Sequence, residues 1–135
     1  MFNGLPGDSL LIETNMDAAG YLQMHWFIIL TAAEEHTQNV VIVNADRIKP
    51  NGKFDHTVIL DPGVHEFITS RSYINYNMAR ITSLATLFEL IKSGTAVPQS
   101  PVSAELLNMI RVGLLKSDFT NNEVREFYRY NTWPI

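Results

Sequence analysis

The sequence contains no cysteine and no long apolar run, and both absences narrow the possible functions. Without cysteine, disulfide bonds, thiolate metal sites and a cysteine nucleophile are excluded. The longest uncharged apolar stretch, WFIIL followed by TAA, is far shorter than the roughly 20 residues of a membrane-spanning helix. The N-terminal stretch MFNGLPGDSLLIET lacks the basic segment of a signal peptide. We therefore expect a cytoplasmic protein without a membrane segment.

Basic residues are absent from the first third of the chain. Residues 1–46 contain six acidic residues and no Lys or Arg, whereas residues 47–92 contain six basic and four acidic residues. Residues 93–135 carry four of each sign. An anionic ligand is therefore expected to contact the middle of the chain, although a local excess of two positive charges is small for a nucleic-acid-binding protein.

Known cofactor and metal motifs are missing as well. The sequence has no dinucleotide-binding motif, no Walker-type phosphate loop and no nucleophile elbow. Its four histidines are too far apart in the sequence for the short ligand spacings of a zinc site: His25, His36, His56 and His65. We expect neither a cofactor nor a metal.

The order of expected elements indicates an α+β fold. Short apolar, β-branched runs separated by turn residues fill residues 1–81, which is typical of a small antiparallel barrel or sandwich. From residue 82 the apolar residues recur at helical spacing, which predicts a helix over SLATLFELIKSG, a second one beginning after Ser103 and a short last one over NNEVREFYRY. TAVPQSP is expected to be a connector. The length of 135 residues predicts one domain, with a β core at 1–81 and a helical extension at 82–135.

The stretch LDPGVHEFITSRSYINYNMARI, residues 60–81, contains the densest set of side chains that suit metal-free RNA cleavage. Such cleavage needs a base, an acid and a cation or hydrogen-bond donor for the phosphate. Candidate catalytic residues are therefore His65, Ser72 and Arg80, with His25 as a further acid or base; candidate substrate-binding residues are Arg71, Tyr73 and Tyr76. Both strand and helix spacing predict that Tyr76 and Arg80 share a face.

The order of GDSLLIET, the strand WFIIL, a polar loop, VVIVNADRI, another strand and a C-terminal helix is similar to that of a known family. This order resembles the MazF/PemK-like toxins, which are SH3-like barrels that cut RNA without a metal, act as homodimers and are silenced by an antitoxin. The resemblance covers roughly residues 5–92. It implies an SH3-like barrel, RNA as substrate, an antitoxin-like partner and a homodimer. The family's arginine position falls near His25, and its hydroxyl position falls near Asn44, Ala45 and Asp46.

Structural interpretations of the same residues remain open. The tyrosines are also typical of packing at a barrel edge, the arginines of surface ion pairs with Glu66 or Glu89, and His65 of a turn. The aromatic tail either packs on the core or forms an interface: Phe127, Tyr128, Tyr130 and Trp133. The sequence thus leaves two functions open, namely a toxin-like RNA-binding or RNA-cleaving protein and a non-catalytic interaction protein of antitoxin, immunity or phage-regulator type.

Overall fold

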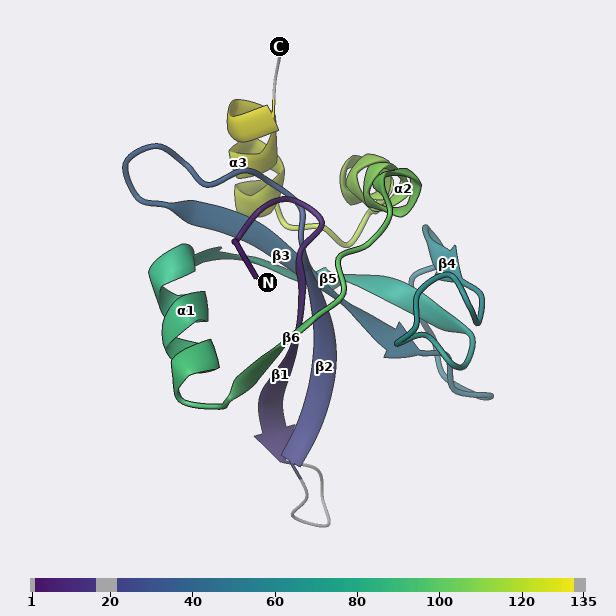
Figure 1. Cartoon of the computed structure of the whole chain (residues 1–135). Coiled ribbons are helices and arrows are strands. Elements are labelled where there is room, and N and C mark those ends of the chain that lie inside the picture. The colour runs from purple at the N-terminus through teal and green to yellow at the C-terminus, as the bar shows by residue number, and fades with distance from the viewer. Residues whose placement is uncertain (1, 17–21, 133–135) are drawn as a thin grey trace.

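A curled antiparallel sheet and three helices make up the part of the chain that the computed structural model describes, residues 2–16 and 22–132 (Figure 1). The strand order is β4-β5-β3-β2-β1-β6. The strands are β1 (Ser9–Met16), β2 (Leu22–Ile29), β3 (Asn39–Arg47), β4 (Ile59–Leu60), β5 (Ser72–Ser83) and β6 (Ala96–Gln99). The helices are α1 (Leu84–Lys92), α2 (Ala104–Lys116) and α3 (Asn122–Thr132). The expected α+β class is confirmed.

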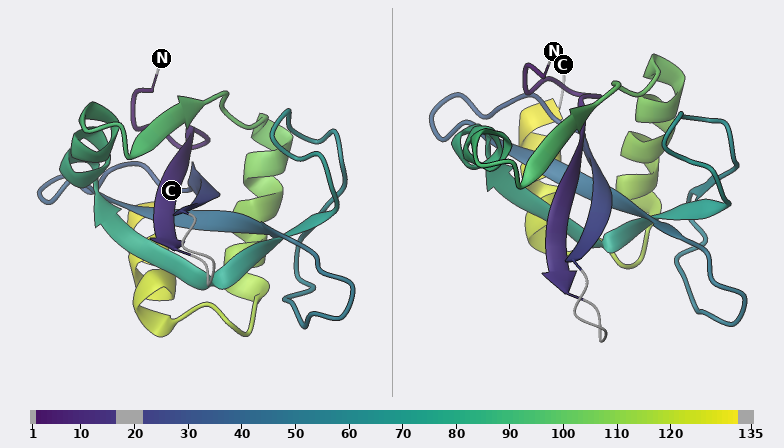
Figure 2. Two further views of the ribbon diagram at one scale, coloured as in Figure 1. Left: turned by 90° about the horizontal axis from the view of Figure 1, so that it is seen from below. Right: turned by 60° about the horizontal axis from the view of Figure 1, so that its bottom comes forward.

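The last strand is a correction to the expected boundary at residue 81. Residues 96–99, which fall in the predicted connector TAVPQSP, form β6 and pair antiparallel with β1. The sheet therefore takes an edge strand from the segment that was expected to be helical. The helix α1 lies between β5 and β6 in the chain and crosses one side of the sheet, whereas α2 and α3 lie on the other side (Figure 2).

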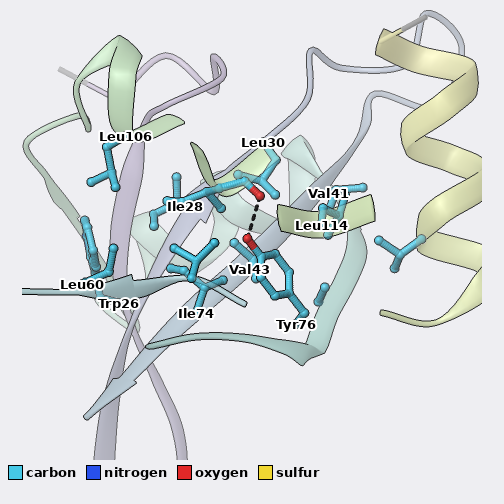
Figure 3. Packing of buried hydrophobic residues seen from close by; sticks show 14 of the residues in the cluster. Trp26, Ile28, Leu30, Val41, Val43, Leu60, Ile74, Tyr76, Leu106 and Leu114 are labelled. Carbon is cyan, nitrogen blue, oxygen red and sulfur yellow. Dashed lines mark hydrogen bonds between the residues drawn. The ribbon is translucent and has the colours of Figure 1, made fainter. Parts of the chain in front are cut away.

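Two apolar clusters cover the two faces of the sheet. β3 contributes to both, because Val41 and Val43 point to one side and Val40 and Ile42 to the other. This is why its sequence is a continuous apolar run and not an alternating one. The larger cluster joins the sheet to α2 and α3, and includes Trp26, Ile28, Leu60, Ile74, Tyr76, Ile110 and Leu114 (Figure 3). The smaller cluster joins the sheet to α1, and includes Leu10, Ile12, Phe27, Ile29 and Leu87.

One close contact fixes α2 on the sheet. The buried Tyr76 hydroxyl donates a hydrogen bond of 2.7 Å to the carbonyl of Ile110 in α2 (Figure 3). A Cβ atom at Gly113 would lie 2.7 Å from a methyl group of Val58 and even closer to the Tyr76 hydroxyl. Glycine at position 113 therefore lets the helix approach the tyrosine, and Tyr76 acts as a core residue.

An irregularity in β5 separates two residues that were predicted to lie together. Ile42 pairs with Arg80 and Asn44 pairs with Asn75, so four β5 residues stand opposite Val43 alone. The three extra residues are an odd number, and side chains alternate between faces at every residue. Tyr76 consequently lies in the core under α2, and Arg80 lies in the groove on the α1 side. The prediction that they share a face is wrong.

The helix termini agree with the sequence. Ser83 and Ser103 cap α1 and α2 by accepting hydrogen bonds from the backbone N–H groups of Thr86 and Leu106. In the tail, Phe127 and Tyr128 pack against the larger cluster. Tyr130 is 86% exposed, and Trp133 lies outside the described residues.

No helix in residues 2–16 and 22–132 combines the length and the apolar character that crossing a membrane requires.

Candidate functional site

Polar residues gather at the end of the sheet where β2 begins and β3 ends. On the α1 face, β2 presents Ile29, Phe27 and His25 in turn, and β3 presents Ile42, Asn44 and Asp46 beside them. The ladder pairs Phe27 with Asn44 and Asn44 with Asn75. This face therefore changes from apolar to polar over about four residues of each strand, because the apolar cluster beneath α1 ends at Phe27.

A hydrogen-bonded group of three side chains stands at this end. The His25 Nδ1 atom lies 3.0 Å from Asp46 Oδ1, and Asn75 Nδ2 donates to Asp46 Oδ2 over 2.8 Å. The side chains of His25 and Asp46 are 28% and 23% exposed. With a neutral imidazole, the Asp46 carboxylate accepts the Nδ1–H bond and leaves Nε2 as the basic atom. No hydrogen bond joins Nε2 to a residue of the described chain, so it is open to a ligand.

A cation lies on the same face. The Arg80 guanidinium lies 5.0 Å from the centre of the Phe27 ring, and Phe27 is two residues after His25 on the same face of β2. Among the described residues, Arg80 has no carboxylate within ion-pair distance. The predicted ion pair with Glu66 or Glu89 is therefore not formed, and the cation is available to an anionic ligand.

These side chains line a groove of about 510 Å³ that we call the histidine groove. Its apolar floor comes from the smaller cluster and from α1, and the group of His25, Asp46 and Asn75 lies at one end. Asn44 is 3% exposed, and its Oδ1 atom has no hydrogen-bond donor in residues 2–16 and 22–132. The groove is lined by Ile12, Glu13, Thr14, His25, Phe27, Ile42, Asn44, Asp46, Asn75, Met78, Arg80, Thr82, Thr86, Leu87 and Leu90.

A second groove of about 890 Å³, which we call the basic groove, lies at the same end of the sheet and mainly on its other face. Trp26, Ala45 and Ser72 form its strand floor, because these positions alternate with those of the histidine groove. His25 and Asp46 line both grooves at their junction. The remaining lining residues are Gln23, Met24, Arg47, Lys49, Gly52, Lys53, Phe54, Glu66, Phe67, Ile68, Thr69, Ser70 and Tyr73.

Tyr73 is the predicted substrate-binding residue that lies in the basic groove. Partial burial, and then the carboxylates of Asp46 and Asp55, raise the pKa of its phenol. The phenol is consequently protonated at neutral pH and presents a hydrogen-bond donor. Its ring packs against Phe54 with centroids 5.3 Å apart.

Three other predicted site residues are engaged in the structure of the protein itself. His65 is 8% exposed, its Nε2 lies 2.8 Å from the Ser100 carbonyl, its Nδ1 accepts from the Phe67 N–H, and its ring packs on Trp26. Ser72 is buried and donates to the Ser70 carbonyl. Burial raises the pKa of the Tyr76 phenol, whose hydroxyl is bonded to α2. The contacts of His65 agree with the interpretation as a turn residue. Tyr76 packs as a core residue under α2 and not at the edge of a barrel.

Arg71 lies apart from both grooves. Its side chain is 63% exposed and makes a long ion pair of 3.6 Å with the exposed Asp61. The structure therefore brings together His25 and Arg80 in one groove and His25, Ser72 and Tyr73 in the other.

Sequence reasoning missed Asp46 and Asn75 as partners of His25. Asn44 and Asp46 have the period-2 spacing of one strand face directly after a buried run, and this was the available signal. Asn75 had no such signal, because its place depends on the β5 irregularity. Among the described residues, no cluster of three or more metal-ligating side chains occurs.

Comparison of the chain with protein-family models, with curated proteins and with solved structures gave no match.

Proposed function

We propose that this protein is a toxin-type endoribonuclease that cuts RNA without a metal, with the histidine groove as its reaction site. The observation that carries the proposal is the carboxylate-oriented His25, whose Nε2 is open, in one groove with the unpaired Arg80. The two sequence positions to which the MazF/PemK resemblance pointed, near 25 and near 44–46, meet in this groove, and this supports an SH3-like barrel of that kind. An antitoxin-like partner and a homodimer belong to the same proposal.

The chemistry follows from the groups in the groove. The 2′-oxygen attacks the adjacent phosphorus, the bond from phosphorus to the 5′-oxygen breaks, and a 2′,3′-cyclic phosphate forms. The 2′-hydroxyl loses a proton to a base and the leaving 5′-oxygen gains one from an acid. Arg80 stabilises the negative charge that grows on the phosphoryl oxygens.

Two proton-transfer groups are needed, and a second titratable side chain, Glu13, lines the same groove as His25. Glu13 lines the groove from β1, one residue beyond Ile12, which pairs directly with His25. Its carboxylate serves as the base. His25 serves as the acid in its protonated form, which gives the Nε2 proton to the leaving 5′-oxygen while Asp46, itself held by Asn75, accepts from Nδ1–H and orients the ring. Carboxylate bases and imidazole acids each suit reactions near neutral pH.

The test is RNA integrity on expression and with purified protein in the presence of EDTA. Wild-type chain is expected to arrest bacterial growth and to produce RNA fragments ending in a cyclic phosphate. His25→Ala is expected to slow cleavage roughly 10²- to 10⁴-fold, and Arg80→Ala is expected to slow it as well. His56→Ala is the matched control, since this exposed histidine lines neither groove.

Normal growth with intact RNA would contradict the proposal and favour a non-catalytic interaction protein. Exposed apolar side chains around α2, namely Met109, Val112 and Phe119, are the feature of the described chain that such a partner would contact. Loss of cleavage in the His56→Ala control to the same degree as in His25→Ala would also contradict it.

A further inference from the structure

The basic groove differs from an ordinary charged surface because its cations are unpaired and its carboxylates are not. Arg47, Lys49 and Lys53 line it, and within the described ranges none of them forms an ion pair. Of the two carboxylates in the lining, Asp46 is held by His25 and Asn75. The other, Glu66, accepts a hydrogen bond from the Ser100 hydroxyl. The groove therefore offers positive charge that the protein itself does not neutralise.

A tight turn presents two of these cations. The Gly52 N–H donates to the Lys49 carbonyl over 3.1 Å, which closes the turn Lys49–Pro50–Asn51–Gly52. Lys53 follows directly, so the two ammonium groups come from the two ends of one turn. Arg47 is the last residue of β3 and pairs with Ser72 on β5.

A buried donor in the same groove lacks an acceptor. Trp26 is fully buried, and its Nε1–H makes no hydrogen bond to any residue in 2–16 or 22–132. A buried polar group without a partner costs about 1–3 kcal/mol. Trp26 is one of the residues that line the groove, so the wall of the groove holds a donor that the protein leaves unused. The unpaired cations call for a negatively charged ligand.

Aromatic side chains add a stacking surface. Phe67 is 37% exposed, with its ring centroid 5.8 Å from that of Trp26, and Tyr73 lies across the groove with its protonated phenol. Unpaired bases stack on such rings, whereas a duplex keeps its bases inside. Cations alternating with aromatic rings are the usual surface for a single strand.

We infer that the basic groove binds a segment of single-stranded RNA next to the cleaved bond, with Arg47, Lys49 and Lys53 on its phosphates. His25 and Asp46 line both grooves, so a strand that leaves the histidine groove passes around the end of the sheet into the basic groove. The choice of RNA rests on the proposed function, whereas the anionic, acceptor-rich character of the ligand rests on the groove itself.

The test measures equilibrium binding in the His25→Ala background, so that binding is observed without cleavage. The probe is a fluorescently labelled single-stranded RNA, and the readout is fluorescence anisotropy over a range of salt concentrations. Lys49→Gln/Lys53→Gln is expected to weaken binding about tenfold and to reduce the slope of log affinity against log salt by about 1.4. Lys92→Gln/Lys116→Gln is the control for net charge, because these last-turn lysines of α1 and α2 line neither groove.

Equal losses in the two double variants, or no loss in either, would overturn the inference. Stronger binding to the duplex form of the same RNA would also overturn it. So would displacement of the RNA, at matched ionic strength, by an acidic peptide whose own binding depends on Lys49 and Lys53. That last result would assign the groove to an acidic protein segment.

Tryptophan emission gives a second, independent measurement. The chain has two tryptophans, so Trp133→Phe leaves Trp26 as the reporter. Saturating RNA is expected to change its emission, and an unchanged emission would contradict the role of its indole N–H.

The two proposals fail in different ways. A chain that binds RNA through Lys49 and Lys53 but never cuts it would sink the endoribonuclease and leave the binding site standing. A chain that cuts RNA, but whose affinity for RNA does not depend on these lysines, would support the endoribonuclease and contradict the binding site.

Discussion

The two grooves at the end of the sheet are built from the same strands and yet differ in kind. In the histidine groove, His25 and Asn75 are both hydrogen-bonded to the Asp46 carboxylate. In the basic groove three cations have no carboxylate partner among the described residues. Alternation of side chains along β2 and β3 separates the two sets. One ladder thus carries a hydrogen-bonded His–Asp–Asn group on one face and unpaired cations on the other. We propose that the first serves acid–base chemistry and the second binds an RNA strand.

Each groove also has one unsatisfied buried atom, and the two atoms are of opposite type. Asn44 Oδ1 in the histidine groove is an acceptor without a donor, and Trp26 Nε1 in the basic groove is a donor without an acceptor, within residues 2–16 and 22–132. A ligand that reached both of these buried atoms would have to supply a donor to the first and an acceptor to the second. An RNA strand carries both, on its bases and sugars and on its phosphates.

A substitution at Asp46 tests the difference between the two grooves most strongly, because Asp46 lines both of them. Asp46→Asn keeps the shape but removes the charge that orients the imidazole. We expect single-turnover cleavage to slow about 10- to 1,000-fold, while RNA binding stays the same or tightens as a negative charge is lost. A parallel loss of binding, with cleavage at saturating RNA unchanged, would show that Asp46 belongs to strand binding and not to chemistry.

Tyr76 tests whether a residue under α2 belongs to either groove. Tyr76→Phe removes one hydrogen bond to the Ile110 carbonyl, and we expect the free energy of unfolding to fall by about 0.5–1.5 kcal/mol. Chemical denaturation measures this loss. Cleavage and RNA affinity should match wild type, since the hydroxyl is buried. A changed affinity in a fully folded variant would show that Tyr76 contributes to RNA binding.

Arg71 provides the matched comparison for Arg80. Its ion pair with Asp61 is exposed and long, so Arg71→Ala should change the free energy of unfolding by less than about 0.5 kcal/mol and leave cleavage unaltered. Arg80→Ala removes a cation from the histidine groove and should slow cleavage. Equal kinetic defects in the two variants would mean that overall charge, and not the groove, governs the reaction.

Glu34 is expected to give the smallest effect, and only in acid. It lies in the turn between β2 and β3, where the backbone N–H of His36, and then the hydroxyl and N–H of Thr37, lower the pKa of its carboxyl to about 2. A lowered pKa stabilises the fold above the ordinary value near 4.5, and this stabilisation is lost as the pH falls toward 2. Glu34→Gln should therefore differ from wild type in denaturation midpoint at pH 7 and converge with it near pH 2. Both grooves should bind and react as before.

The sequence predicted most of the elements, because turn residues, serine caps and apolar spacing are local signals. A resemblance in element order also pointed to His25 and to the segment 44–46 as two family positions, without predicting that they are in contact. The sequence failed where nonlocal pairing decides the outcome. Part of a proline-containing connector becomes β6 because it pairs with the edge of β1. The three extra residues in β5 change which of its side chains face α1. The environments of His65 and Tyr76 likewise depend on nonlocal contacts, with the Ser100 carbonyl and with α2.

We propose that the histidine groove carries out the chemistry and the basic groove binds the RNA. Single-turnover cleavage across a range of protein concentrations tests this division most directly. For His25→Ala we predict a rate constant at saturation that falls roughly 10²- to 10⁴-fold, with an unchanged half-saturating concentration. For Lys49→Gln/Lys53→Gln we predict the reverse, namely a half-saturating concentration about tenfold higher and an unchanged rate constant at saturation. A lysine variant that lowers the saturated rate while His25→Ala leaves it intact would contradict this division.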